Sequence, residues 1–146
     1  MPALVPLPPS APLVSDEELA TLRALVAAAG PAYLEELRRL VGIDCGSYTP
    51  AGVDEVGRAV AAALADLGAE VTSHPSARLG GTVVGVLRGE GRARLLMIGH
   101  MDTVFDPGTA AARPFRIEDG RAYGPGVSDM KGGLLAGLTA LTALRG

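Results

Sequence analysis

The sequence predicts an α/β fold in which helices come before and after a β-sheet. Apolar residues recur at helical spacing through the first part of the chain. Short runs rich in β-branched residues follow, each bounded by glycine or charged residues. A last stripe of leucines at helical spacing ends the chain. The order helix, sheet, helix is typical of a layered α/β sandwich, and 146 residues of which 48% are hydrophobic are enough for one core.

Two helices are predicted before the first turn-rich segment. Ser15 and Glu18 fit a capping box, and the helix that they begin is expected to end at Gly30. Pro31 suits the first turn of a second helix, because a proline there sacrifices no helical hydrogen bond, and this helix is expected to end near Gly42. The apolar stripes are Leu19, Leu22, Leu25 and Val26 in the first helix and Leu34, Leu37, Leu40 and Val41 in the second.

A third helix is predicted from Val53, with Gly68 at its C-terminal cap. Three β-rich runs follow at residues 69–74, 81–87 and 94–100, and the last two are expected to be neighbouring strands. The third run contains the continuous apolar string LLMI, which is typical of a strand that is covered on both faces.

The C-terminal third of the chain predicts a hairpin and a helix. Residues 115–124 alternate around Asp119-Gly120, a pair that favours a tight β-turn. The closing helix carries Leu134, Leu135, Leu138, Leu141 and Leu144 along one stripe.

Composition and charge exclude several classes of function. The net charge is -3, and the arginines form no basic stripe, so no nucleic-acid partner is expected. Residues 1–14 are apolar but rich in proline and lack a basic start, so we expect a flexible leader and neither a signal peptide nor a membrane span. The remaining residues, 15–146, are expected to form one domain. The single cysteine, Cys45, cannot form an internal disulfide, which suits the cytoplasm.

His100 and Asp102 form the first candidate site. His100 follows the LLMI run, so its imidazole is expected at the carboxyl end of a strand, where α/β sheets place their ligands. Residues two apart in extended chain point to the same side, which brings the imidazole and the carboxylate of Asp102 together. Such a pair can bind a divalent metal directly, or the aspartate can orient the metal ligands by hydrogen bonding without contacting the metal. On spacing alone, a histidine at a strand end beside a turn-forming aspartate is the more common reason for such a pattern, since a metal site needs several converging donors.

Asp129 lies in the second candidate site, a glycine-rich loop at residues 124–133 that leads into the last helix. A carboxylate at this position can bridge two cations, although an aspartate at the start of a helix is also a common N-cap. Glycine-rich turns before helices also bind phosphates in nucleotide-binding modules. That match is poor here, because Lys131 is followed by Gly132 and not by serine or threonine.

Three other residues carry weaker signals. His74 is expected on the surface at the end of a short strand. Cys45 is interpreted as a small apolar-tolerant residue and not as a nucleophile. Lys131 is the only lysine in the chain, and it either stabilises the loop and its carboxylates or lies on the helix surface.

The two candidate sites together resemble a known signature pair. HMDTV at residues 100–104, PFR at 114–116 and YGPGVSDMKGG at 123–133 resemble the motifs of the two-zinc family of glutamate carboxypeptidase, acetylornithine deacetylase and succinyl-diaminopimelate desuccinylase. The similarity extends upstream through LVGIDCGSYTPAGVDEVGRAVAAALADLGAEV and covers residues 31–145. The chain is most similar to the glutamate carboxypeptidase subgroup, because that subgroup shows a similar HMDTV and an APFR-like run before the YGPG loop.

The resemblance implies a fold, a cofactor and a role for each residue. It implies part of a zinc-exopeptidase-like α/β/α sandwich with a mixed β-sheet. His100 would bind one zinc, Asp129 would bridge two zincs, and Asp102 would be a catalytic residue that orients His100 or the base; cobalt or manganese could substitute for zinc. His100 and Asp129 would then lie within about 4 Å of each other. The Asp129-Met130 peptide bond would be cis.

The resemblance also implies a reaction, but this sequence departs from the family pattern in one respect. Members hydrolyse amide bonds of small peptides or N-acyl amino acids, and they often dimerise through a domain that this sequence lacks. They take a general-base glutamate and further ligands from positions after the bridging aspartate, and no glutamate follows Asp129 here. We therefore expect the N-terminal part of an amide hydrolase that is inactive by itself. The alternative is a truncated or split-gene product without activity that needs a C-terminal half.

Overall fold

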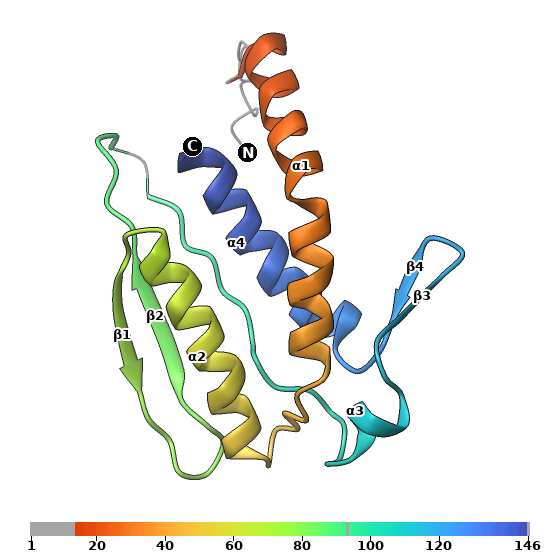
Figure 1. Cartoon of the computed structure of the whole chain (residues 1–146). Coiled ribbons are helices and arrows are strands. Elements are labelled where there is room, and N and C mark those ends of the chain that lie inside the picture. Colours follow the sequence, from red (N-terminus) through yellow and green to blue (C-terminus); the bar gives the residue numbers. More distant parts are fainter. Residues whose placement is uncertain (1–13, 93, 146) are drawn as a thin grey trace, which may run out of the picture.

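A computed structural model of the chain describes residues 14–92 and 94–145. Its long helices stand side by side, one β-hairpin covers α2, and a second hairpin projects to the side, away from α1 (Figure 1). The combination of helices and strands confirms the predicted α/β class. All but one residue of the predicted leader, residues 1–14, lie outside the described residues.

The first helix, α1 (Asp16–Val41), begins where predicted, but it is one continuous helix in place of the two that were predicted. The backbone N–H of Ser15 donates to Glu18 Oε2 at 2.7 Å, and the Glu18 N–H donates to Ser15 Oγ at 3.2 Å, which confirms the capping box. The predicted break at Gly30 and Pro31 is wrong, because Pro31 lies inside the helix. Its missing N–H removes one hydrogen bond, but the turns beyond it are held by tertiary contacts, including a 3.0 Å hydrogen bond from Tyr33 Oη to the carbonyl of Gly132.

The second helix, α2 (Pro50–Asp66), starts three residues earlier than predicted, with Pro50 in the first turn. Gly68 follows it with a φ of 77°, the left-handed conformation expected of a C-terminal cap. The strands β1 (Glu70–His74) and β2 (Thr82–Val86) confirm the first two β-rich runs. They pair with each other in antiparallel fashion, and α2 packs along them.

The predicted third strand at residues 94–100 is wrong. This segment is extended (Figure 1), but no described residue pairs with it as a strand, so the expected pairing with β2 is absent from the described part of the chain. Leu95 and Ile98 are each 82% exposed, so the expected cover on both faces is missing within the described part of the chain. The segment passes between α2 and α4 and leads to His100 (Figure 1). The described strands form two antiparallel pairs and no mixed sheet.

The predicted hairpin is present as β3 (Arg116–Glu118) and β4 (Arg121–Tyr123). Asp119 and Gly120 have φ values of 49° and 72°. Positive φ at both central residues is the requirement of a type I′ turn, which explains the Asp-Gly pair.

A short helix that the sequence did not predict, α3 (Thr109–Ala112), precedes this hairpin. Its start is capped from another segment: the N–H groups of Gly108 and Ala110 donate to the Asp44 carboxylate at 2.7 and 2.8 Å. These hydrogen bonds hold the pKa of Asp44 below its ordinary value, and the charge of Lys131 lowers that pKa further. The connection between α1 and α2 is thereby fastened to α3.

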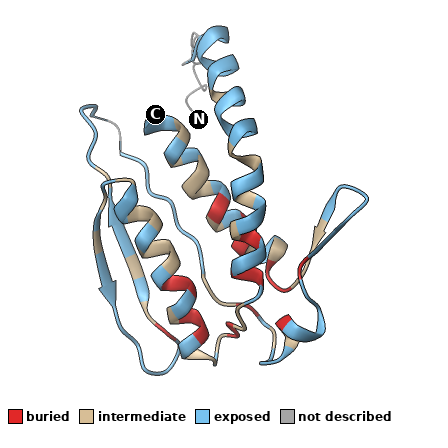
Figure 2. Ribbon diagram, in the orientation of Figure 1, coloured by how far each residue is buried: buried red, intermediate tan, exposed pale blue. Residues whose placement is uncertain are grey.

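The core lies where the end of α1, the start of α2 and the last helix, α4 (Gly132–Arg145), come together (Figure 2). Its buried residues are Leu37, Leu40, Val41, Cys45, Val53, Val56, Phe115 and Leu135. By contrast, Leu19, Leu25 and Val26 in the first half of α1 are exposed, so most of the predicted stripe there lies outside the core. No described helix is both long and apolar enough to cross a membrane.

Candidate functional site

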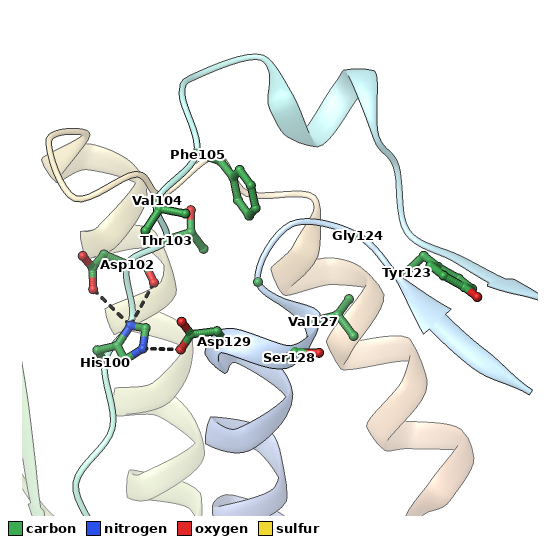
Figure 3. Close-up of a pocket in the computed structure, with 11 residues that line it drawn as sticks. His100, Asp102, Thr103, Val104, Phe105, Tyr123, Gly124, Val127, Ser128 and Asp129 are labelled. Atoms are coloured by element: carbon green, nitrogen blue, oxygen red, sulfur yellow. Dashed lines mark hydrogen bonds and ion pairs between the residues drawn. The ribbon is translucent and has the colours of Figure 1, made fainter.

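The three residues that the sequence singled out, His100, Asp102 and Asp129, lie together on the wall of a cavity of about 400 Å³. Two segments form most of this cavity: residues 100–105, which follow the extended run, and residues 123–129, which lead into α4. The imidazole of His100 lies between the two carboxylates (Figure 3).

His100 contacts both aspartates through opposite ring nitrogens. Its Nε2 lies 2.7 Å from Asp129 Oδ1, as close as expected for two residues of one site. Its Nδ1 lies 3.0 Å from the Asp102 carbonyl oxygen and 3.2 Å from Asp102 Oδ1. Desolvation lowers the pKa of His100, but hydrogen bonds to Asp129 and Asp102 and the charges of both carboxylates raise it, and the net pKa lies above the ordinary value.

Ser47 holds Asp102 in place. Its hydroxyl donates a short hydrogen bond to Asp102 Oδ2, and its N–H donates to the Thr103 carbonyl at 3.0 Å. The N–H of Thr103 in turn donates to the Cys45 carbonyl at 2.8 Å, beside a parallel bridge between Gly46 and Thr103. Ser47 thus contacts Asp102, which contacts His100, and in metalloproteins a carboxylate behind the imidazole commonly orients a metal-binding histidine.

Ser47 was not predicted from the sequence. Residues 43–52 are rich in turn formers and indicate only a break between helices, and nothing in that pattern indicates a contact with a residue 55 positions away. The only available signal was a hydroxyl within the upstream stretch that resembles the family.

The loop that carries Asp129 has an irregular backbone. The Asp129-Met130 peptide bond is cis, as the family resemblance implied. Met130 also approaches the site, because its Sδ accepts the His100 N–H at 3.3 Å. Gly126 has a φ of 79°, and a Cβ there would lie 2.9 Å from Thr103 Cγ2, so the loop approaches the neighbouring segment more closely than a side chain allows.

Lys131 is buried, with only 1% of its surface exposed, so the expectation of a helix-surface lysine is wrong and its stabilising role is supported. Its Nζ donates to the carbonyls of Leu40 at 2.7 Å and Ile43 at 2.8 Å. These carbonyls lie at and just beyond the C-terminal end of α1, where a positive charge is favourable. Lys131 therefore fastens the loop of Asp129 to α1.

The other singled-out residues lie away from the cavity. His74 is exposed at the end of β1, and Cys45 is buried in the core with a free thiol. Within residues 14–92 and 94–145, no group of three or more histidine, cysteine, aspartate or glutamate side chains is arranged to hold a metal ion. The described site thus offers two adjacent donors, His100 Nε2 and the Asp129 carboxylate, with Asp102 behind the histidine.

Comparison with known proteins identifies the relatives of this site. Residues 96–146 match the sequence model of peptidase family M20/M25/M40. Carboxypeptidase G2 from Pseudomonas sp. is 41% identical over 117 residues, which are 79% of this chain and 28% of that protein. Cysteinylglycine-S-conjugate dipeptidase from Corynebacterium striatum is 36% identical over 60% of this chain and 20% of its own length. Acetylornithine deacetylase from Pectobacterium carotovorum is 34% identical over 70% of this chain and 29% of its own length.

The chain therefore spans less than a third of the length of each of these curated relatives. The family model covers both HMDTV and the Asp129 loop, and the similarity to carboxypeptidase G2 extends over most of the chain. The resemblance predicted from the sequence is confirmed: residues 96–146 are similar to peptidase family M20/M25/M40, and most of the chain is similar to carboxypeptidase G2.

Proposed function

We propose that this chain contributes the N-terminal part of a zinc-dependent hydrolase that cleaves amide bonds of small peptides or N-acyl amino acids. His100 is the proposed ligand of one zinc, Asp129 the proposed bridge between two, and Asp102 the residue that orients His100. The observation that carries the proposal is the 2.7 Å approach of His100 Nε2 to Asp129 Oδ1 on the wall of a cavity.

The chemistry of these donors fits zinc, which prefers imidazole nitrogen and carboxylate oxygen. The His100 Nδ1 is engaged by Asp102, so Nε2 is the nitrogen that faces Asp129. The side chains of His100 and Asp129 are 46% and 80% exposed, so both can be reached from solvent. The hydrogen bond between His100 Nε2 and Asp129 Oδ1 joins the two atoms that would coordinate the metal, so a shared cation can replace it.

A pair of zinc ions at such a site would polarise an amide carbonyl and lower the pKa of bound water. This chain's own residues contribute position and charge. Ser47 fixes one oxygen of Asp102, and Asp102 then fixes the ring of His100. Lys131 keeps the Asp129 loop against the end of α1.

The substrate class rests on the names of the relatives and on the cavity. A carboxypeptidase, a dipeptidase and a deacetylase all act on a C–N bond next to a carbonyl. A cavity of about 400 Å³ is in the range that accepts a small molecule. We propose a C-terminal glutamate peptide or an N-acyl amino acid as substrate, and the cytoplasm as the compartment, where the single buried thiol of Cys45 stays reduced.

Zinc titration of the 146-residue chain, followed by NMR of the imidazole groups, tests the proposal. The sequence contains two histidines, so each gives a separable signal. Zinc is expected to shift the His100 signals and to leave those of His74 unchanged. His100→Ala is expected to weaken zinc binding at least about 10-fold, because an imidazole is the strongest donor of the pair.

His74→Ala is the matched control, because it removes the other imidazole from an exposed strand end outside the cavity. Equal zinc affinity in His100→Ala and the unmodified chain, or a zinc-induced shift at His74 alone, would contradict the assignment of His100.

Ser47→Ala tests the support behind the site. Loss of the hydroxyl leaves Asp102 Oδ2 without its donor, so His100 is less well oriented, and zinc affinity is expected to fall about 10-fold. The variant keeps both proposed ligands, so some binding should remain. Isothermal titration calorimetry measures the change, and Ser73→Ala, on the exposed strand β1, is the control. Unchanged zinc affinity in Ser47→Ala would show that Asp102 does not depend on Ser47.

A further inference from the structure

A second cavity, of about 300 Å³, adjoins the candidate active site. Phe105, Tyr123 and Gly124 line both cavities, so the two share one wall. The remaining lining residues of the second cavity are Arg113 and Arg116. Across the first cavity, Tyr123 lies on the side opposite His100 and Asp102 (Figure 3).

Each arginine of the second cavity stacks on one of the shared aromatic rings. The Cζ of Arg113 lies 4.4 Å from the centroid of the Phe105 ring, and the Cζ of Arg116 lies 4.5 Å from that of Tyr123. Stacking uses the face of a planar guanidinium and leaves N–H groups on its edge. Two N–H groups on one edge match the two oxygens of a carboxylate.

The two arginines differ in how far their charge is already balanced. Arg116 Nε donates to Glu118 Oε1 at 2.8 Å, in a pair whose side chains are half exposed. For Arg113, no carboxylate within the described residues lies at ion-pair distance. The edge of the cavity at Arg113 is therefore the stronger position for an anion.

The backbone holds this pair in place before any ligand arrives. Arg113 caps the C-terminus of α3, and Asp44 fixes the start of that helix through two backbone N–H groups. Arg116 is the first residue of β3 and lies opposite Tyr123 in the paired strands. A site on such fixed elements loses little entropy on binding.

We propose that Arg113 and Arg116 form a subsite for a free carboxylate group of the substrate. The inference rests on the proposed function, because the shared wall places this carboxylate next to the cavity in which His100 and Asp129 would handle the amide. A carboxylate is favoured over a phosphate, because the adjoining cavity carries the negative charges of Asp102 and Asp129, which repel a dianion more strongly than a monoanion.

The test measures glutarate binding to the metal-free 146-residue chain by NMR of the arginine side-chain N–H groups. Glutarate is expected to bind in the millimolar range or tighter, and its neutral diamide, glutaramide, is expected to bind at least about 10-fold more weakly. Arg113→Gln is expected to weaken glutarate binding about 10-fold, and Arg116→Gln about 3-fold, because Glu118 already shares the second guanidinium. Higher salt should weaken binding, since both arginines are exposed.

Arg38→Gln is the matched control. Arg38 also stacks on an aromatic ring, with its Cζ 4.8 Å from the centroid of Phe115, but it lines neither cavity. Circular dichroism establishes that each variant is folded. Equal weakening by Arg38→Gln, equal binding of glutaramide, tighter binding of inorganic phosphate, or no glutarate binding by the folded chain would each overturn the subsite.

The zinc titration keeps the two proposals separable. If the chain does not bind glutarate more tightly than glutaramide but still binds zinc through His100, the subsite is excluded and the proposed function remains. Glutarate binding that depends on Arg113, in a chain that does not bind zinc through His100, removes the proposed function and leaves the carboxylate site.

Discussion

Lys131→Met is expected to lower the free energy of unfolding by about 3 kcal/mol, because it removes the ammonium group that donates to two carbonyl groups at the end of α1. The Leu40 carbonyl is buried and the Ile43 carbonyl is partly buried, so water cannot fully replace the ammonium group. Methionine fills a similar volume, which restricts the change to the loss of the hydrogen bonds and the charge. Urea denaturation followed by circular dichroism measures the difference.

Arg58→Met is the control for the loss of one positive charge, because Arg58 is exposed on α2. It is expected to change the free energy of unfolding by no more than about 0.5 kcal/mol. If Lys131→Met is as stable as Arg58→Met, the buried lysine does not hold the end of α1, and the position of the Asp129 loop must have another cause.

Gly52→Ala is expected to lower the free energy of unfolding by about 3 kcal/mol through a backbone clash. A Cβ at this position would lie 1.9 Å from the carbonyl oxygen of Asp44 and 3.1 Å from the Cα of Cys45. Both contacts are with backbone, so rotation of a side chain cannot relieve them. The first turn of α2 would have to move away from the connection that carries Ser47, and urea denaturation measures the cost.

Gly30→Ala is the matched control in α1, where a Cβ meets nothing within 4 Å. Because alanine is favoured over glycine in helices, this variant is expected to gain up to about 1 kcal/mol. Opposite signs for the two substitutions are the expected result. A stable Gly52→Ala variant would mean that the two segments do not approach as closely as the structure shows.

Both destabilising variants act on the connection between α1 and α2. Lys131 holds the carbonyl of Ile43, Gly52 allows the approach of Asp44, and Ser47 in the same connection contacts Asp102. Changes here are therefore expected to weaken zinc binding as well as stability, although none of these residues is a proposed ligand.

The sequence by itself determined the features whose causes are local. Ser15 and Glu18 form the capping box because they are three positions apart, on one helical turn. The Asp119-Gly120 pair specifies its turn because both positions require positive φ. The signature motifs also predicted that His100 and Asp129 would meet, since they carry a resemblance to a family whose sites are already known.

Only the tertiary structure decided the features that depend on distant residues. Pro31 remains inside α1 because contacts beyond it hold the helix, including Tyr33 with Gly132, 99 positions away. Lys131 is buried because the carbonyl of Leu40, 91 positions away, accepts a hydrogen bond from its Nζ. The run that contains Leu95 is apolar enough for a buried strand, but a strand also needs a partner for its backbone hydrogen bonds. The sequence pattern indicates which side chains favour burial, but it does not indicate which distant segment will lie beside them.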